Sequence, residues 1–159
     1  MAIMQLGNTI QTTMTFTPEK IRQTLTSPTI YIDIRKSQIE ARAENFLFCT
    51  SGHESKVYQN IIVIDTKGTL IKVKNVKAIG KIKLWTSLKY FSPVKEVLPN
   101  IEGDVQSISV DDFKRLIIET ISKKPGAWSN LDTLDNITRE INNCKTYKDI
   151  IVFFNPRLK

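Results

Sequence analysis

The amino-acid sequence predicts an α+β fold, namely a mostly antiparallel β-meander of about five strands over residues 29–86, with a short N-terminal helix, two C-terminal helices packed on one face and a short C-terminal strand. Hydrophobic residues alternate with polar ones between residues 29 and 86 and recur with a helical period between residues 109 and 144. No internal repeat or linker rich in Gly, Ser or Pro interrupts the 159 residues. We therefore expect a single domain over residues 1–159.

The first element that the sequence predicts is a short helix within residues 15–25. Thr17 is a suitable N-cap, and Pro18 suits the first helical position because it has no N–H to leave unbonded. Ile21 and Leu25 are four residues apart and share one face of such a helix.

Period-two alternation predicts the sheet. The strands are expected at residues 29–35, 38–48, 56–65, 69–76 and 80–86. Lys36-Ser37 is expected to form a tight turn between the first two strands. The sequence DTKG at residues 65–68 predicts a hairpin turn in which Gly68 takes a positive φ. Residues 92–103 contain two prolines and are expected to be an irregular connection.

Helical signals dominate the C-terminal third. Ser109 is a candidate N-cap with Asp112 three residues later, a variant of the capping box, and Pro125-Gly126 is expected to stop this helix. A second helix is predicted over residues 129–144, capped by its first serine and with leucines and isoleucines inward. Residues 149–154, DIIVFF, form a short continuous apolar run that we interpret as a buried strand.

The positive charge of the chain is concentrated in one segment. Residues 66–95 contain eight lysines and no acidic residue, so they carry +8, while the whole chain carries +7 and the other 129 residues therefore sum to −1. Concentrated basicity of this kind indicates an anionic partner more than a general solubility trait. We treat residues 66–95 as a basic β module.

The lysines of this module predict a binding face. If residues 69–76 and 80–86 pair as a hairpin, alternate lysines fall on one face together with an aromatic ring. Lysines neutralise phosphates and exposed rings stack on bases, as nucleic-acid binding requires. The predicted nucleic-acid-binding residues are Lys72, Lys74, Lys77, Lys81, Lys83, Trp85, Lys89 and Tyr90. The competing interpretation is a solvated strand face, on which lysine also prevents edge-to-edge aggregation.

Residues 46–56 contain residue types that can carry out catalysis. Cys49 and His53 could act as nucleophile and base, but no Asp or Asn is placed to orient the imidazole. We interpret them as a half-buried structural cysteine and an exposed loop histidine. The chain has one histidine and lacks P-loop, GxGxxG and CxxC patterns, so no cofactor or metal site is expected.

One metal-dependent hypothesis stays open. Asp65 and Lys67 end an apolar strand in a D-x-K arrangement that is similar to half of a restriction-type nuclease site, in which carboxylates hold Mg²⁺ and a lysine helps to activate water. Asp33 or Glu54 could supply the second carboxylate. The same residues are also typical of a hairpin turn, and we expect catalytic residues only if this hypothesis holds.

The expected compartment is cytoplasmic or otherwise reducing, and the protein is not expected to be secreted. No apolar run approaches the roughly 20 residues that span a bilayer, and the N-terminus has no signal-peptide pattern. Two cysteines separated by most of the chain are typical of free thiols in a reducing environment.

Together these observations favour a small non-enzymatic protein that binds nucleic acid, DNA or RNA, with little sequence specificity. No arginine lies between residues 43 and 114, so bidentate reading of bases is not expected there. The alternative hypothesis is a protein-interaction module, such as an inhibitor, immunity or matrix-like protein, whose partner is an acidic protein or an anionic membrane surface. A metal-dependent nuclease is the third hypothesis.

Overall fold

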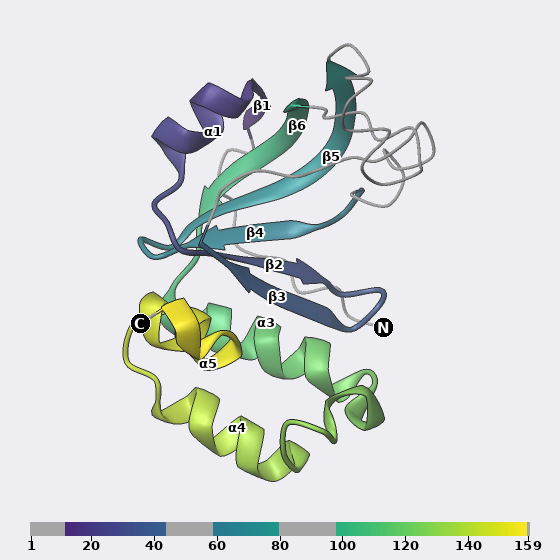
Figure 1. The fold of residues 1–159 in the computed structure, drawn as a ribbon, viewed down its shortest axis with the longest axis vertical. Coiled ribbons are helices and arrows are strands. Elements are labelled where there is room, and N and C mark those ends of the chain that lie inside the picture. Colours follow the sequence, from purple (N-terminus) through teal and green to yellow (C-terminus); the bar gives the residue numbers. More distant parts are fainter. Residues whose placement is uncertain (1–11, 44–58, 80–97, 159) are drawn as a thin grey trace.

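The computed structural model describes residues 12–43, 59–79 and 98–158 of the chain. Within these ranges the fold is α+β and every pair of neighbouring strands in its sheet is antiparallel, as predicted (Figure 1). The sheet has six strands and not about five, and it is not a simple meander, because Ile62–Asp65 pairs with Thr29–Asp33 and not with Gln38–Arg42. The predicted strand at residues 80–86 lies outside the described ranges. The spatial order of the strands is β1-β6-β5-β4-β2-β3. The strands are β1 (Thr12–Phe16), β2 (Thr29–Asp33), β3 (Gln38–Arg42), β4 (Ile62–Asp65), β5 (Thr69–Ile79) and β6 (Leu98–Ser107).

Helices cover both faces of this sheet. They are α1 (Pro18–Thr24), α3 (Val110–Ser122), α4 (Leu134–Asn143) and α5 (Tyr147–Phe154), with 3-10 turns η2 (Pro125–Trp128) and η3 (Pro156–Leu158). The three C-terminal α-helices lie together below the strands in Figure 1, whereas α1 lies near β1 at the other end of the molecule. No helix among the described residues is long and apolar enough to cross a membrane.

Two hydrophobic clusters, one on each face of the sheet, form the core. The first joins β2 and β4 to the C-terminal helices through side chains such as Ile32, Ile64 and Phe113. The second joins α1 to the opposite face through side chains such as Ile21, Val63 and Val73. Strand β2 is consequently buried along its whole length, although its alternating sequence predicted a strand with one polar, exposed face.

Both predicted turns of the described sheet are confirmed. Strands β4 and β5 form a hairpin through the turn at residues 65–68, in which Gly68 has a φ of 79°. Strands β2 and β3 form a hairpin through the turn that contains Ser37, whose φ is 55°. The Thr17 side chain accepts a hydrogen bond from the Lys20 N–H, so the predicted N-cap of α1 is confirmed as well.

The prediction of a C-terminal strand was wrong, because residues 149–154 belong to helix α5. Thr146 and Asp149 form a reciprocal capping box that starts this helix, and Ile150 and Ile151 bury their side chains in the core. A short continuous apolar run fits a buried helix as well as a buried strand, and here the cap decides between them.

Strand β6 occupies the second half of the region predicted as an irregular connection, residues 98–103. Leu98 to Ser107 pair with both β1 and β5, so this strand is stabilised by partners that are distant in sequence. The second C-terminal helix also begins later than predicted. Ser129 donates a hydrogen bond to the carbonyl of Gly126 in the turn after η2, and Thr133 caps α4 in its place.

Candidate polyanion-binding face

The predicted binding residues that the structure describes lie on β5. Ile71 and Val73 point into the cluster beneath α1, so Lys72 projects from the opposite side of the sheet and is exposed. Register shifts between Val73 and Asn75, which makes Lys74 the extra residue of a β-bulge. We define the Lys72 face as the part of the sheet surface that carries Thr13, Lys72, Lys74, Glu102 and Asp104.

Lys74 does not present a free charge on this face. Its Nζ lies 2.8 Å from Oδ1 of Asp104 and 2.9 Å from Oγ1 of Thr13. The Thr13 hydroxyl in turn donates to the same carboxylate oxygen of Asp104 over 2.7 Å. The three polar groups therefore form a closed triangle that links β5 and β1 across β6.

Asp104 is the buried member of this triangle, with 4% of its surface exposed. The hydrogen bond from Lys74 lowers the pKa of its carboxyl group below the ordinary value; burial opposes this effect, and the Thr13 hydroxyl and the positive charges of Lys74 and Lys72 add to it. Asp104 is therefore ionised at neutral pH, and its negative charge offsets the positive charge of Lys74.

Lys72 is in a different position. It stands opposite Asp104 in the β5–β6 register, and among the described residues its ammonium group makes no ion pair. Glu102 is two residues from Asp104 on β6 and so shares its face. The described part of the Lys72 face thus carries two ammonium groups and two carboxylates, and of the two lysines only Lys74 is held in an ion pair among the described residues.

The sequence analysis did not identify Asp104 or Thr13 as members of this face. Both lie on strands, β6 and β1, that the local pattern did not predict, and their contact with Lys74 depends on long-range pairing. Lys67 is exposed in the β4–β5 turn, and Lys77 lies in β5 opposite Asn100. The remaining predicted residues lie outside the described ranges: Lys81, Lys83, Trp85, Lys89 and Tyr90.

Asp65, the candidate nuclease carboxylate, is fully buried and satisfied by the main chain. Its Oδ1 accepts hydrogen bonds from the N–H groups of Lys67 at 2.9 Å and Thr69 at 2.7 Å. Its Oδ2 accepts one from the N–H of Thr26 at 3.0 Å. These contacts hold the β4–β5 turn and the segment after α1 together, which is a structural role.

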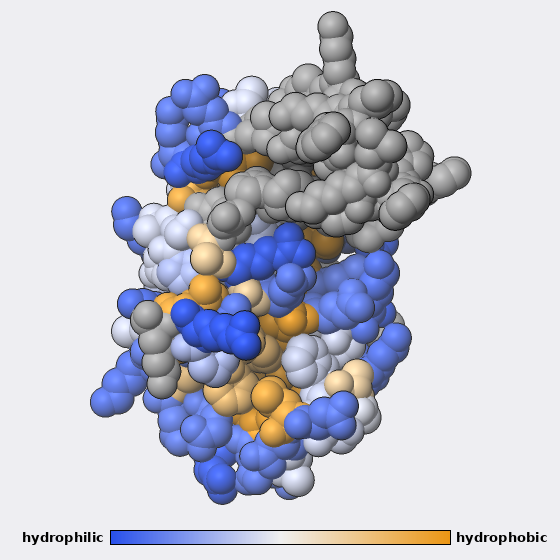
Figure 2. Space-filling view, viewed as in Figure 1, coloured by the Kyte–Doolittle hydropathy of each residue, from blue (hydrophilic) through white to orange (hydrophobic). Residues whose placement is uncertain are grey.

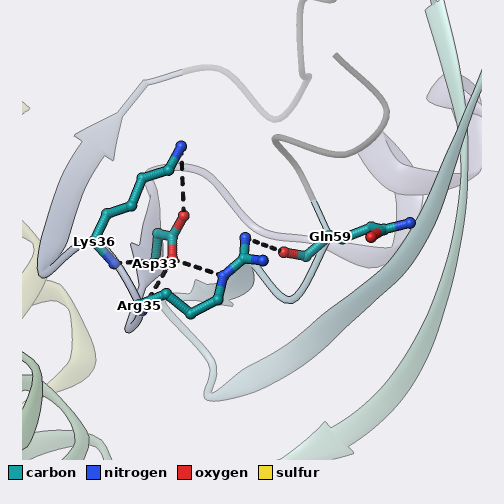
Figure 3. Close-up of polar contacts among 4 residues, drawn as sticks. All are labelled: Asp33, Arg35, Lys36 and Gln59. Atoms are coloured by element: carbon teal, nitrogen blue, oxygen red, sulfur yellow. Dashed lines mark hydrogen bonds and ion pairs between the residues drawn. The ribbon is translucent and has the colours of Figure 1, made fainter. Parts of the chain in front are cut away.

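Asp33 organises the β2–β3 turn in a similar way (Figure 3). Its Oδ1 accepts hydrogen bonds from the N–H groups of Arg35 at 3.0 Å and Lys36 at 3.3 Å. The Arg35 guanidinium approaches the same oxygen and donates to the carbonyl of Gln59 at 2.6 Å. The turn is thereby tied to the segment that leads into β4.

The two candidate carboxylates are too far apart to share a metal ion. Asp65 pairs with Thr29, whereas Asp33 lies four residues further along β2. Four residues of strand correspond to about 13 Å. Among the described residues no group of three or more His, Cys, Asp or Glu side chains could hold a metal ion, and Glu54 lies outside those residues.

The two cysteines and the histidine give no further site within the described residues. Cys144 is a partly buried free thiol at the end of α4, and burial raises the pKa of its thiol. A raised pKa lowers the thiolate fraction and hence the reactivity of the sulfur. Cys49 and His53 lie outside the described ranges.

An open hollow of about 500 Å³ lies between the β2–β3 turn and η2. It is lined by residues 36–40, Ala127 and Trp128. The indole N–H of Trp128 donates to the Ser37 hydroxyl, which donates to the carbonyl of Thr120, so this wall of the hollow is fastened to α3. Figure 2 shows hydrophobic residues over the helical half of the molecule, framed by hydrophilic ones.

Comparison of the chain with protein-family models, with curated proteins and with solved structures gave no match.

Proposed function

We propose that this protein is a non-enzymatic nucleic-acid-binding protein of low sequence specificity. The observation that carries the proposal is the segment of residues 66–95, which has eight lysines and no acidic residue. Binding of such a segment to a polyanion is driven mainly by the release of counterions that are condensed on the polyanion. The predominance of lysine favours contacts to phosphates over bidentate recognition of bases.

The described contacts refine which lysines would contribute. Among the described residues the exposed ammonium of Lys72 makes no ion pair and is available to a phosphate, whereas the ammonium of Lys74 is already held by Asp104 and Thr13. We therefore expect Lys72 to contribute to the salt dependence of binding and Lys74 to contribute less. The other lysines of the segment and Trp85 enter the proposal from the sequence.

The test is fluorescence anisotropy with labelled single-stranded and double-stranded oligonucleotides over a series of salt concentrations. Lys72→Ala should flatten the log–log salt slope by about 0.9 on duplex and about 0.7 on single strands, if Lys72 neutralises one phosphate. Lys148→Ala is the matched control, because Lys148 is an exposed lysine on α5 outside the segment. This control should leave the slope unchanged.

Trp85→Ala tests the stacking part of the proposal. It should weaken single-strand binding by about 1–3 kcal/mol and leave the salt slope nearly unchanged, because stacking releases no ions. Absence of any binding by the wild-type protein at low salt would contradict the proposed function. Weak binding that Trp85→Ala changes equally for both kinds of strand would favour the alternative partner, an acidic protein.

A further inference from the structure

The triangle of Lys74, Asp104 and Thr13 is an unusual feature for a face that serves a polyanion. A β-bulge places Lys74 as an extra residue in β5, and the ammonium group is directed to a carboxylate that is 4% exposed. Bulges redirect single side chains and are enriched beside functional sites. Here the redirected side chain is Lys74, which belongs to the acid-free segment of residues 66–95, and the carboxylate that binds it is that of Asp104 on β6.

The contacts determine how strongly Lys74 is held. An ammonium group has three N–H donors, of which Asp104 and Thr13 take two at 2.8 and 2.9 Å. The side chain of Lys74 is still 48% exposed, so its remaining donor can face solvent. A phosphate approaching Lys74 would therefore compete with a carboxylate that is already in place.

We infer that Asp104 is an internal counterion that keeps Lys74 from binding phosphate and so sets the affinity of the Lys72 face for polyanions. The inference rests on the proposed function, because it assigns a regulating residue to the same face. It predicts that neutralising Asp104 raises affinity and steepens the salt dependence. Replacing a carboxylate elsewhere on the surface should not do this.

The experiment compares wild type with Asp104→Asn, in which an amide of the same shape can still accept the hydrogen bonds of Lys74 and Thr13. On the full chain, the log–log salt slope should steepen by about 0.9 for duplex and about 0.7 for single strands. The matched control is Glu119→Gln, which makes the same change in net charge. Glu119 pairs with Lys123 on the exposed side of α3, outside residues 66–95.

A double variant separates a local effect from net charge. Lys74→Gln combined with Asp104→Asn has the net charge of wild type, and it should return the slope to the wild-type value if Lys74 is the group released. A steep slope in the double variant would overturn the inference. Thermal melts of each variant establish that the comparison is between folded proteins.

A second measurement, made without nucleic acid, keeps the inference distinct from the proposed function. Acetylation by acetic anhydride, read by mass spectrometry, should modify Lys74 more slowly than Lys72 in wild type, and Asp104→Asn should bring the two rates together. Equal rates in wild type would overturn the inference. If wild type and Asp104→Asn bind polyanions with the same slope, the inference fails while the proposed function stands. If neither wild type nor Asp104→Asn binds polyanions, the inference and the proposed function fail together.

Discussion

Replacement of Asp65 tests whether this residue has a structural or a catalytic role. Its carboxylate is fully buried and accepts three main-chain hydrogen bonds, from Thr26, Lys67 and Thr69. In Asp65→Asn the amide nitrogen must face one of these N–H groups, so one hydrogen bond is lost and the other two become neutral. Hydrogen bonds to charged groups contribute about 1.5–3 kcal/mol and are roughly twice as strong as neutral ones.

From these contacts we expect Asp65→Asn to lower the free energy of unfolding by roughly 2–4 kcal/mol. Asp65→Ala, which leaves all three donors without an acceptor, should cost roughly 3–6 kcal/mol. The latter is a large part of the roughly 5–15 kcal/mol by which domains are stable. Urea denaturation followed by far-ultraviolet circular dichroism measures both values.

Glu140→Gln is a suitable control, because Glu140 is exposed on α4. Its free energy of unfolding should stay within about 0.5 kcal/mol of wild type. The structural reasoning would be refuted if Asp65→Asn also stayed within that limit. A variant with unchanged stability but lost nuclease activity would instead revive the metal-dependent hypothesis.

Two further predictions concern stability. Gly68→Ala should lower the free energy of unfolding by at least about 1–2 kcal/mol, or roughly 2–8 °C in Tm, because Gly68 has a φ of 79° and an added Cβ would lie 2.5 Å from Cζ of Tyr147. Gly126→Ala is the control, because a Cβ added there would meet no other part of the described structure within 4 Å. Equal melting temperatures of the two variants would contradict the prediction. Asp104→Asn should be less stable than wild type at pH 7, and this difference should shrink as the pH falls below about 4. The reason is that folding lowers the pKa of the Asp104 carboxyl group. Such a carboxylate stabilises the folded protein above its unfolded pKa, and the stabilisation is lost as the pH falls through its folded pKa. Urea midpoints from pH 7 to pH 3 test this, and a difference that does not change with pH would show that Asp104 contributes through shape alone.

The local sequence was sufficient where the determining interactions lie within a few residues. The turn at Gly68 depends on the φ of one glycine, and the N-caps at Thr17 and Ser109 depend on a hydroxyl three residues from the N–H that it binds. The antiparallel strand pairs β2–β3 and β4–β5 follow from short turns between alternating segments. These features were predicted correctly for that reason.

Only the tertiary structure decided the features that depend on distant partners. Strand β6 exists because it pairs with β1 and β5, and β2 is buried on both faces because helices from both ends of the chain cover it. The same long-range pairing brings Asp104 and Thr13 to Lys74. The sequence alone determined that residues 66–95 are rich in lysine and free of acidic residues. The carboxylate that neutralises Lys74, however, belongs to Asp104 on the neighbouring strand β6. A count of charges along one segment cannot reveal it, because the contact forms only when the two strands pair.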